Sequence, residues 1–156
     1  LNFDSVTVAP YMGKDSVEPF LAFENKHTIL LALTSNEGAF DFQTKISNDK
    51  EIYKHVLETS KSWKNNQNLM YVVGATKASD FSSIRNIIPN HFLLVPGIGA
   101  QGGSLKDISE KAMNGDCGLL VNASRAVIYA SGNEDFAAEA KAIAEQYQVE
   151  MKSYLK

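Results

Sequence analysis

The segment of residues 92–104 constrains the fold of this chain more than any other stretch. Its four leading apolar residues predict a short buried strand, which Pro96 ends. Four glycines follow within residues 97–103, so the backbone there can turn tightly and approach a ligand closely. Ser104 then matches a helix N-cap, with Asp107 in the capping-box position. A strand, a glycine turn and a helix N-terminus present backbone N–H groups to an anion, and phosphate is the first candidate.

The same glycines also fit the spacing of the dinucleotide fingerprint, Gly97-x-Gly99-x-x-Gly102. In dinucleotide-binding proteins this motif follows the first strand, and an acidic residue about 20 positions later binds the ribose. Here several predicted strands come before the glycines, and no carboxylate ends the next strand. Because Arg125 ends it instead and could meet the extra phosphate of NADP, an NADP-binding oxidoreductase of the Rossmann type stays open as an alternative.

Length and composition indicate one globular domain over residues 1–156. Of the 156 residues, 44% are hydrophobic and 21% are charged, which is ordinary for a single core. The net charge of −3 and the pI near 5.6 argue against nucleic acid or an anionic membrane as a partner. No apolar run approaches the length of a membrane span. The single cysteine, Cys117, excludes an internal disulfide and suits a reducing compartment, so we expect a cytoplasmic protein.

Five apolar segments alternate with helical patterns along the chain. The predicted strands are residues 6–9, 28–33, 69–73, 92–95 and 119–121. This alternation predicts an α/β protein with a parallel sheet, and the continuous apolar runs predict that both faces are covered. Between the second and third strands, Asn48 and Glu51 predict the start of a helix. Its expected inner face consists of Ile52, Val56, Thr59 and Trp63.

Polar side chains gather where the predicted strands end, which is where parallel α/β proteins bind ligands. They are Ser35, Asn36, Thr76, Lys77, Gln101, Ser124 and Arg125. The planar fork of Arg125 matches phosphate, and Gln101 can both donate and accept. A glycine turn after one strand and Ser-Arg after the next form the phosphate site at strands 7 and 8 of a TIM barrel. Counted that way, the chain supplies about five βα units, strands 4 to 8, of a TIM (β/α)8 barrel.

Other kinds of chemistry find little support in the sequence. No His, Cys and carboxylate cluster has metal-ligand spacing, and no Cys/His or Ser/His/Asp arrangement for nucleophilic catalysis is discernible. Lys77, at a strand end, is a weak candidate for a base. The three histidines lie before strands or within a helix, away from the expected ligand end, so we assign them no role. They are His27, His55 and His91.

Five segments of the chain resemble orotidine 5′-phosphate decarboxylase, in the bacterial branch that carries Thr-Ser-Asn after strand 5. They are residues 6–13, 33–36, 73–76, 95–103 and 122–125. They follow the family's order along the whole chain, and the Pro-Gly-Ile-Gly-Ala-Gln-Gly-Gly block is quite specific to that enzyme. The resemblance implies a TIM-barrel homodimer that converts orotidine monophosphate to UMP in pyrimidine biosynthesis, without a cofactor.

The resemblance also implies how the two ends of the nucleotide are bound. Arg125 would grip the phosphate with help from the backbone N–H groups of Gly102 and Ser124. Gln101 would bridge the phosphate and the base.

At the base, Ser35 would hydrogen-bond the amide edge of the pyrimidine. Pro96 and Ile98 would line the pocket around the ring.

One family motif does not occur in this sequence. The family's acid–base centre is an Asp/Lys network with an Asp-x-Lys-x-x-Asp motif, whose lysine protonates the carbanion, and we expect these catalytic residues upstream of Leu1. Five strands also cannot close a barrel and would leave two sheet edges unpaired. We therefore expect the C-terminal part of a decarboxylase, with a non-catalytic nucleoside-monophosphate binder as an alternative.

Overall fold

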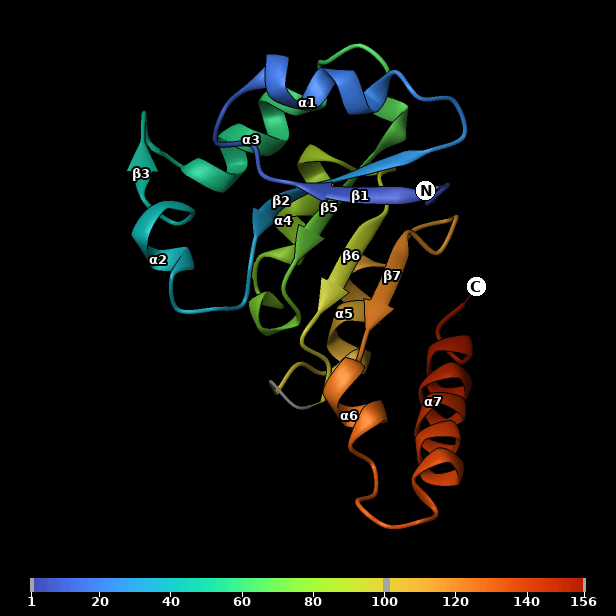
Figure 1. The fold of residues 1–156 in the computed structure, drawn as a ribbon. Helices are drawn as coiled ribbons and strands as arrows, with labels where there is room; N and C mark the ends of the chain where they lie inside the picture. Colours follow the sequence, from blue (N-terminus) through green and yellow to red (C-terminus); the bar gives the residue numbers. More distant parts are fainter. Residues whose placement is uncertain (1, 100–101, 156) are drawn as a thin grey trace.

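The computed structural model describes residues 2–99 and 102–155 of the chain. Five parallel strands form the main sheet in the order β1-β2-β5-β6-β7. Their bounds are β1 Ser5–Val8, β2 His27–Leu33, β5 Leu69–Val73, β6 Leu93–Pro96 and β7 Leu119–Asn122. The order across the sheet follows the order along the chain, so the sheet never reverses direction (Figure 1). All five predicted strands are confirmed.

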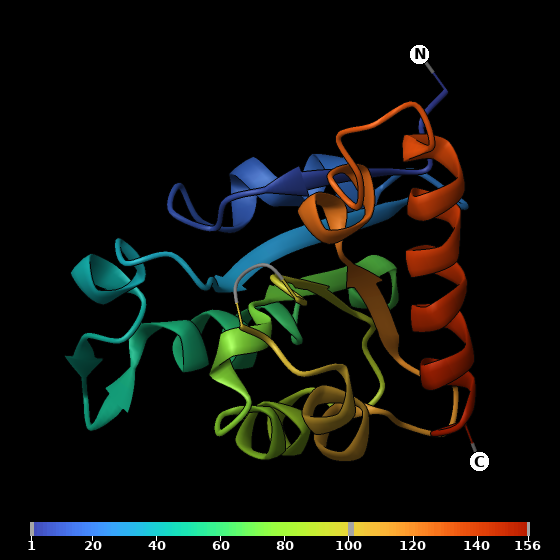
Figure 2. The same cartoon turned by 90° about the horizontal axis from the view of Figure 1, so that it is seen from below.

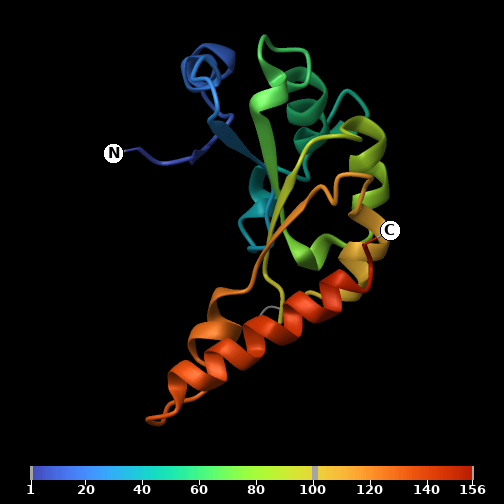
Figure 3. The same cartoon turned by 90° about the vertical axis from the view of Figure 1, so that its right-hand side faces the viewer.

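Helices follow the strands, and most of them pack against one face of the sheet, whereas the short helix after the last strand lies beyond its end. They are α1 Lys14–Leu21, α3 Ile52–Ser60, α4 Phe81–Ile87, α5 Leu105–Ala112, α6 Ser124–Ile128 and α7 Phe136–Lys152, with short 3-10 turns η1 Asn66–Asn68 and η2 Ala75–Lys77. In Figure 3, α3, α4 and α5 stack along one side of the strands. Alternate strand residues such as Leu30, Tyr71 and Leu93 are fully buried in the core on this side. No helix among the described residues is long and apolar enough to cross a bilayer.

The opposite face of the sheet carries a separate apolar cluster made of strand residues. Ile29, Met70 and Val72 are buried in it, and Leu31 and Leu94 pack against them. The expectation that both faces are covered is therefore met only on the helical face. On the second face Leu31 and Leu94 are only half-buried and Leu120 is 49% exposed, so that part of the expectation was wrong. In the described part of the chain, β1 and β7 are the edges of this sheet.

Residues between β2 and α3 form an excursion that the sequence pattern did not predict. It holds the short helix α2 (Ala39–Phe42) and the antiparallel hairpin of β3 (Ile46–Ser47) and β4 (Lys50–Glu51). Figure 2 shows it projecting from the sheet on the side away from α7.

The helix predicted to open at Asn48 was wrong in its start, and its face was right only in part: Val56 packs against the core as expected, whereas Thr59 is exposed. Asn48 and Asp49 both have positive φ, 48° and 63°, and form the two-residue turn of the hairpin. The helix α3 begins only at Ile52, and its buried face is Tyr53, Leu57 and Ser60. Trp63, just beyond the helix, is 7% exposed and packs in the core, as expected of a packing residue.

Candidate functional site

A cavity of about 280 Å³ lies where β2, β6 and β7 end. Its lining consists of Ser35, Pro96, Gly97, Ile98, Asn122, Ser124 and Arg125. Five of the side chains predicted to bind substrate are therefore brought to one cavity from three strands. The sixth predicted residue, Gly102, is exposed in the adjoining loop and does not line the cavity, and Gln101 lies outside the described residues.

The pairing of β6 with β7 sets two of the walls. Pro96 and Asn122 are partners in the last step of this ladder, so both reach the cavity from neighbouring strands. The Ser124 hydroxyl donates to Oδ1 of Asn122 at 2.7 Å, which ties the first residue of α6 to the last residue of β7. Sequence reasoning assigned Asn122 no role of its own, although its place beside Ser124 at a strand end was the available signal.

The glycine loop after β6 folds back on its own backbone. Gly97 and Gly102 have φ of 99° and 82°, a region that favours glycine. The Gly102 amide donates to the Gly99 carbonyl at 2.8 Å, and the Gly103 amide donates to the Gly97 carbonyl at 3.2 Å. A β-carbon added to Gly103 would lie 2.8 Å from that carbonyl oxygen, so the loop has no room for a side chain there. The tight turn predicted from the glycines is confirmed.

The helix α5 begins directly after this loop with the predicted cap. Ser104 is its N-cap, and the Asp107 amide donates to the Ser104 hydroxyl at 3.1 Å. Asp107 is the acidic residue of the first turn. The order of strand, glycine turn and capped helix is therefore as the sequence predicts.

Ser35 lies in a segment that a side chain from the excursion holds. The Thr34 amide donates to Oε1 of Gln43 at 2.7 Å, and Nε2 of Gln43 donates to the Thr34 hydroxyl at 2.9 Å. The Thr34 hydroxyl is also 2.6 Å from Oδ1 of Asn36. Gln43 was missed by sequence reasoning, because nothing in the local pattern shows that α2 folds back onto the end of β2.

Arg125 gives the cavity its charge. It is the single charged side chain in the lining, and among residues 2–99 and 102–155 it forms no ion pair. An exposed guanidinium beside a serine hydroxyl and a glycine loop suits a bound anion with several oxygens, since its planar fork can donate twice. Lys77 does not reach this lining, because its ammonium lies 4.5 Å from the centre of the Phe40 ring.

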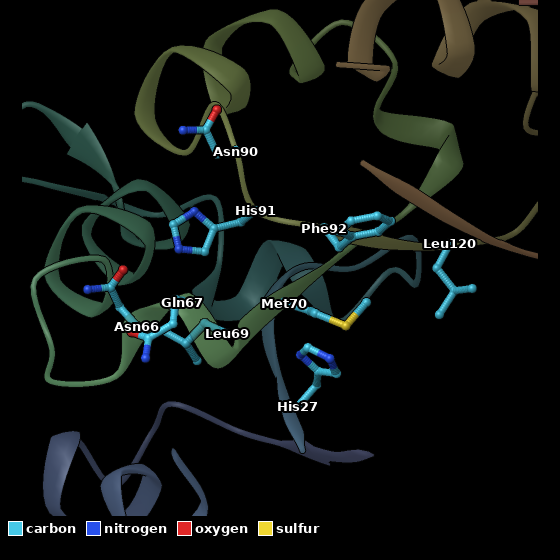
Figure 4. Close-up of a pocket in the computed structure, with 9 residues that line it drawn as sticks. All are labelled: His27, Asn66, Gln67, Leu69, Met70, Asn90, His91, Phe92 and Leu120. Atoms are coloured by element: carbon cyan, nitrogen blue, oxygen red, sulfur yellow. The ribbon is translucent and has the colours of Figure 1, made fainter. Parts of the chain in front are cut away.

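A larger cavity of about 580 Å³ lies at the other end of the strands (Figure 4). Its lining consists of His27, Asn66, Gln67, Leu69, Met70, Asn90, His91, Phe92 and Leu120. Burial, with the nearby Arg85 and Lys61, lowers the pKa of His91, so its imidazole is neutral at pH 7. His27 and His91 thus lie away from the predicted site, as expected. No group of acidic, histidine and cysteine side chains in the described part could hold a metal ion.

The comparisons with known proteins agree on one family. The model of the orotidine 5′-phosphate decarboxylase / HUMPS family matches residues 1–143. Two relatives described as orotidine 5′-phosphate decarboxylase, from Flavobacterium johnsoniae and Christiangramia forsetii, are 72% and 66% identical over 97% and 99% of this chain. The chain spans about half of their length, 55% and 57%.

Solved structures give the same answer for the fold. An OMP decarboxylase structure from Leishmania donovani matches with a TM-score of 0.81 and 34% identity, over 96% of this chain and 58% of that one. The UMP synthase structure of the same organism matches with a TM-score of 0.83 and 37% identity, over 96% of this chain and 34% of that one. The parallel α/β sheet therefore matches decarboxylase TIM-barrel structures. With a family model matched over residues 1–143, the chain belongs to the orotidine 5′-phosphate decarboxylase / HUMPS family.

Proposed function

We propose that the protein containing this chain decarboxylates orotidine 5′-monophosphate to UMP, a step of pyrimidine biosynthesis. Residues 1–156 would form the C-terminal part of its TIM barrel, strands 4 to 8, and would supply the phosphate and base contacts. The observation that carries the proposal is the single cavity of about 280 Å³ lined by Ser35, Pro96, Ile98, Ser124 and Arg125. The two relatives that are 72% and 66% identical to this chain are described as orotidine 5′-phosphate decarboxylases, which supports the same substrate.

The phosphate end of the substrate would lie at the end of β7 and the glycine loop. Arg125 would donate to two phosphate oxygens, and the backbone N–H of Ser124 would add to the contact. The Gly102 amide donates to the Gly99 carbonyl at 2.8 Å, so it would join the contact only by giving up that bond. Gln101 would bridge from the phosphate to the base. Binding energy gained at the phosphate, far from the reacting carbon, would hold the base in place for the chemistry.

The base end would lie against the end of β2. Ser35 would hydrogen-bond the amide edge of the pyrimidine, and Pro96 with Ile98 would line the ring pocket. Ile98 is 3% exposed, which suits the apolar side of such a pocket. Loss of CO₂ leaves an electron pair on the ring carbon, and a proton must then be delivered there. We infer that the Asp/Lys centre that delivers it is supplied from outside this chain, since no Asp-x-Lys-x-x-Asp occurs in it.

The rest of the expected biology follows from the family. We propose that the complete protein works without a metal or cofactor, as a homodimer in the cytoplasm. The Rossmann alternative is not favoured, because the five strands run in sequential order without reversal and the glycine fingerprint follows β6 rather than the first strand.

The test is a decarboxylase assay on the protein made from its native gene. We expect orotidine 5′-monophosphate to be consumed and UMP to appear, measured by chromatography, without added metal or cofactor. UMP that binds in a calorimetric titration while no turnover occurs would support the non-catalytic binder instead. If neither UMP binding nor turnover is found, the proposed function is wrong.

A further inference from the structure

The end of β2 leaves a backbone donor that no strand can satisfy. The Leu33 carbonyl accepts from the Gly74 amide at 2.8 Å, toward β5. Because backbone groups alternate along a strand, the Thr34 amide points the other way, toward β1. The ladder between β1 and β2 has already ended at Val8 and Leu30. A side chain must take the place of the absent strand, or the donor of a half-buried residue stays unsatisfied.

Gln43 takes that place. Its Oε1 accepts from the Thr34 amide at 2.7 Å, and its Nε2 donates to the Thr34 hydroxyl at 2.9 Å. A glutamine amide is the side chain that can imitate a peptide group, since it offers one acceptor and one donor in a plane. The Thr34 hydroxyl in turn donates to Oδ1 of Asn36 at 2.6 Å. Both neighbours of Ser35 are therefore linked to the Gln43 side chain, Thr34 directly and Asn36 through Thr34.

The backbone of Gln43 is itself fixed to the core. Its amide donates to the carbonyl of Ala39 at 2.9 Å, and its carbonyl accepts from the amide of Tyr53 at 2.9 Å. Ala39 is fully buried and Tyr53 is 1% exposed, so both anchors are packed. Through Tyr53 the glutamine is connected to α3, and the Tyr53 hydroxyl in turn donates to Asp80 at 3.0 Å. The hydrogen bonds between Gln43 and Thr34 therefore do not depend on the exposed hairpin of β3 and β4.

We propose that Gln43 is a positioning residue: its side-chain amide holds residues 34–36 so that Ser35 faces the cavity. The inference rests on the proposed function, in which Ser35 contacts the base. Gln43 does not line the cavity and would act only through the segment that it holds. It would raise affinity by reducing the conformational freedom that Ser35 loses when the substrate binds.

The first test is the kinetics of Gln43→Ala in the protein made from its native gene. We expect KM to rise about tenfold with kcat changed less than about threefold. The reason is that the contact of Ser35 with the base would be weakened equally in the bound substrate and in the transition state. Gln43→Glu keeps the acceptor for the Thr34 amide, but the one hydroxyl proton of Thr34 must then go either to the carboxylate or to Asn36. Its KM should therefore fall between the values of the wild type and Gln43→Ala. Gln67→Ala is the control, because Gln67 is exposed at the opposite end of the strands. A purely structural loss would lower kcat through the active fraction and leave KM unchanged, which would overturn the proposal.

The second test asks whether Gln43 acts through Ser35. The double variant Gln43→Ala with Ser35→Ala should raise KM no more than Ser35→Ala alone, whereas independent effects would multiply and overturn the proposal. A third measurement needs no activity: exchange of the Thr34 amide proton, followed by NMR without ligand, should be faster in Gln43→Ala. Unchanged exchange would also overturn it. If the wild-type protein shows no decarboxylase activity, the proposed function fails, and the exchange rate still decides the role of Gln43.

Discussion

The backbone of Ser35 lies directly against Gly74: a β-carbon added to Gly74 would lie 2.7 Å from the Ser35 backbone nitrogen. The φ and ψ of Gly74, −65° and 137°, are open to any residue, so the constraint is space and not backbone conformation. β2 and β5 thus end in direct contact, and this contact fixes the height of Ser35 above the sheet.

Gly74→Ala should therefore push Ser35 away from the cavity. We expect a loss of about 1–3 kcal/mol in the free energy of unfolding, because the new methyl group meets backbone and not the end of a flexible side chain. Nucleotide affinity, measured by calorimetric titration of UMP, should fall as well. The matched control is Gly115→Ala, since a β-carbon there meets nothing within 4 Å. Equal effects of the two substitutions would contradict this account of Ser35.

Replacement of the cavity's one charged side chain should weaken the grip on phosphate. For Arg125→Ala we expect kcat/KM to fall at least about 30-fold, equivalent to roughly 2 kcal/mol or more for a bidentate charged contact. Arg125→Lys keeps the positive charge but loses the planar guanidinium, so its kcat/KM should lie between the values of the wild type and Arg125→Ala. Lys106→Ala serves as the control, because Lys106 is an exposed cation of α5 paired with Glu110 at 3.9 Å. A loss below tenfold for Arg125→Ala would remove Arg125 from the phosphate site.

The parts of the structure that sequence patterns predicted are those set by local rules. The strands were readable because each is a continuous apolar run, and the start of α5 was readable because Ser104 and Asp107 carry their own cap. The residues that line the cavity of about 280 Å³ were readable because parallel strands end at one edge, which brings the ends of β2, β6 and β7 together. Their role in binding substrate stays a prediction.

The parts that were not readable depend on contacts across the fold. Asn48 and the residues after it are compatible with either a helix start or a hairpin turn. In the structure Asn48 and Asp49 adopt left-handed conformations, which form the turn of a hairpin. Gln43 looks like any helix-end residue until α2 is placed beside β2. Its role is set by the amide of Thr34, nine residues earlier in the chain, which has no strand partner and donates to the Gln43 side chain instead. No periodicity in the sequence reveals this contact.

The stability of the protein should fall at acidic pH in a way that His91 controls. Burial, together with the positive charges of Arg85 and Lys61, lowers the pKa of His91 in the folded state. The unfolded chain then binds more protons than the folded one below about pH 6.5, so stability is full above that value and is lost as the pH falls. We expect the urea concentration at the midpoint of unfolding to decrease as the pH is lowered from about 7.5 to about 5. In His91→Gln this decrease should be smaller. The same slope in both proteins would contradict the assignment.

The long helix α7 is expected to constrain the glycine loop through one hydroxyl group. A β-carbon added to Gly99 would lie 2.6 Å from Oη of Tyr147, whereas the Tyr147 ring carbon that carries this oxygen is 3.9 Å away. Gly99 also has a φ of 72°, so Gly99→Ala should combine a clash with backbone strain of about 1 kcal/mol or more. Tyr147→Phe removes the clashing atom and leaves the strain.

We therefore expect the two substitutions to be coupled. Urea unfolding of the four proteins in the cycle should show that Gly99→Ala costs at least about 0.5 kcal/mol less in the Tyr147→Phe background. The remaining cost measures the backbone strain and the contact with Ala126, which is 3.3 Å from the same β-carbon. If the costs simply add, the Tyr147 hydroxyl does not lie against Gly99 in solution, and α7 does not constrain the glycine loop at this position.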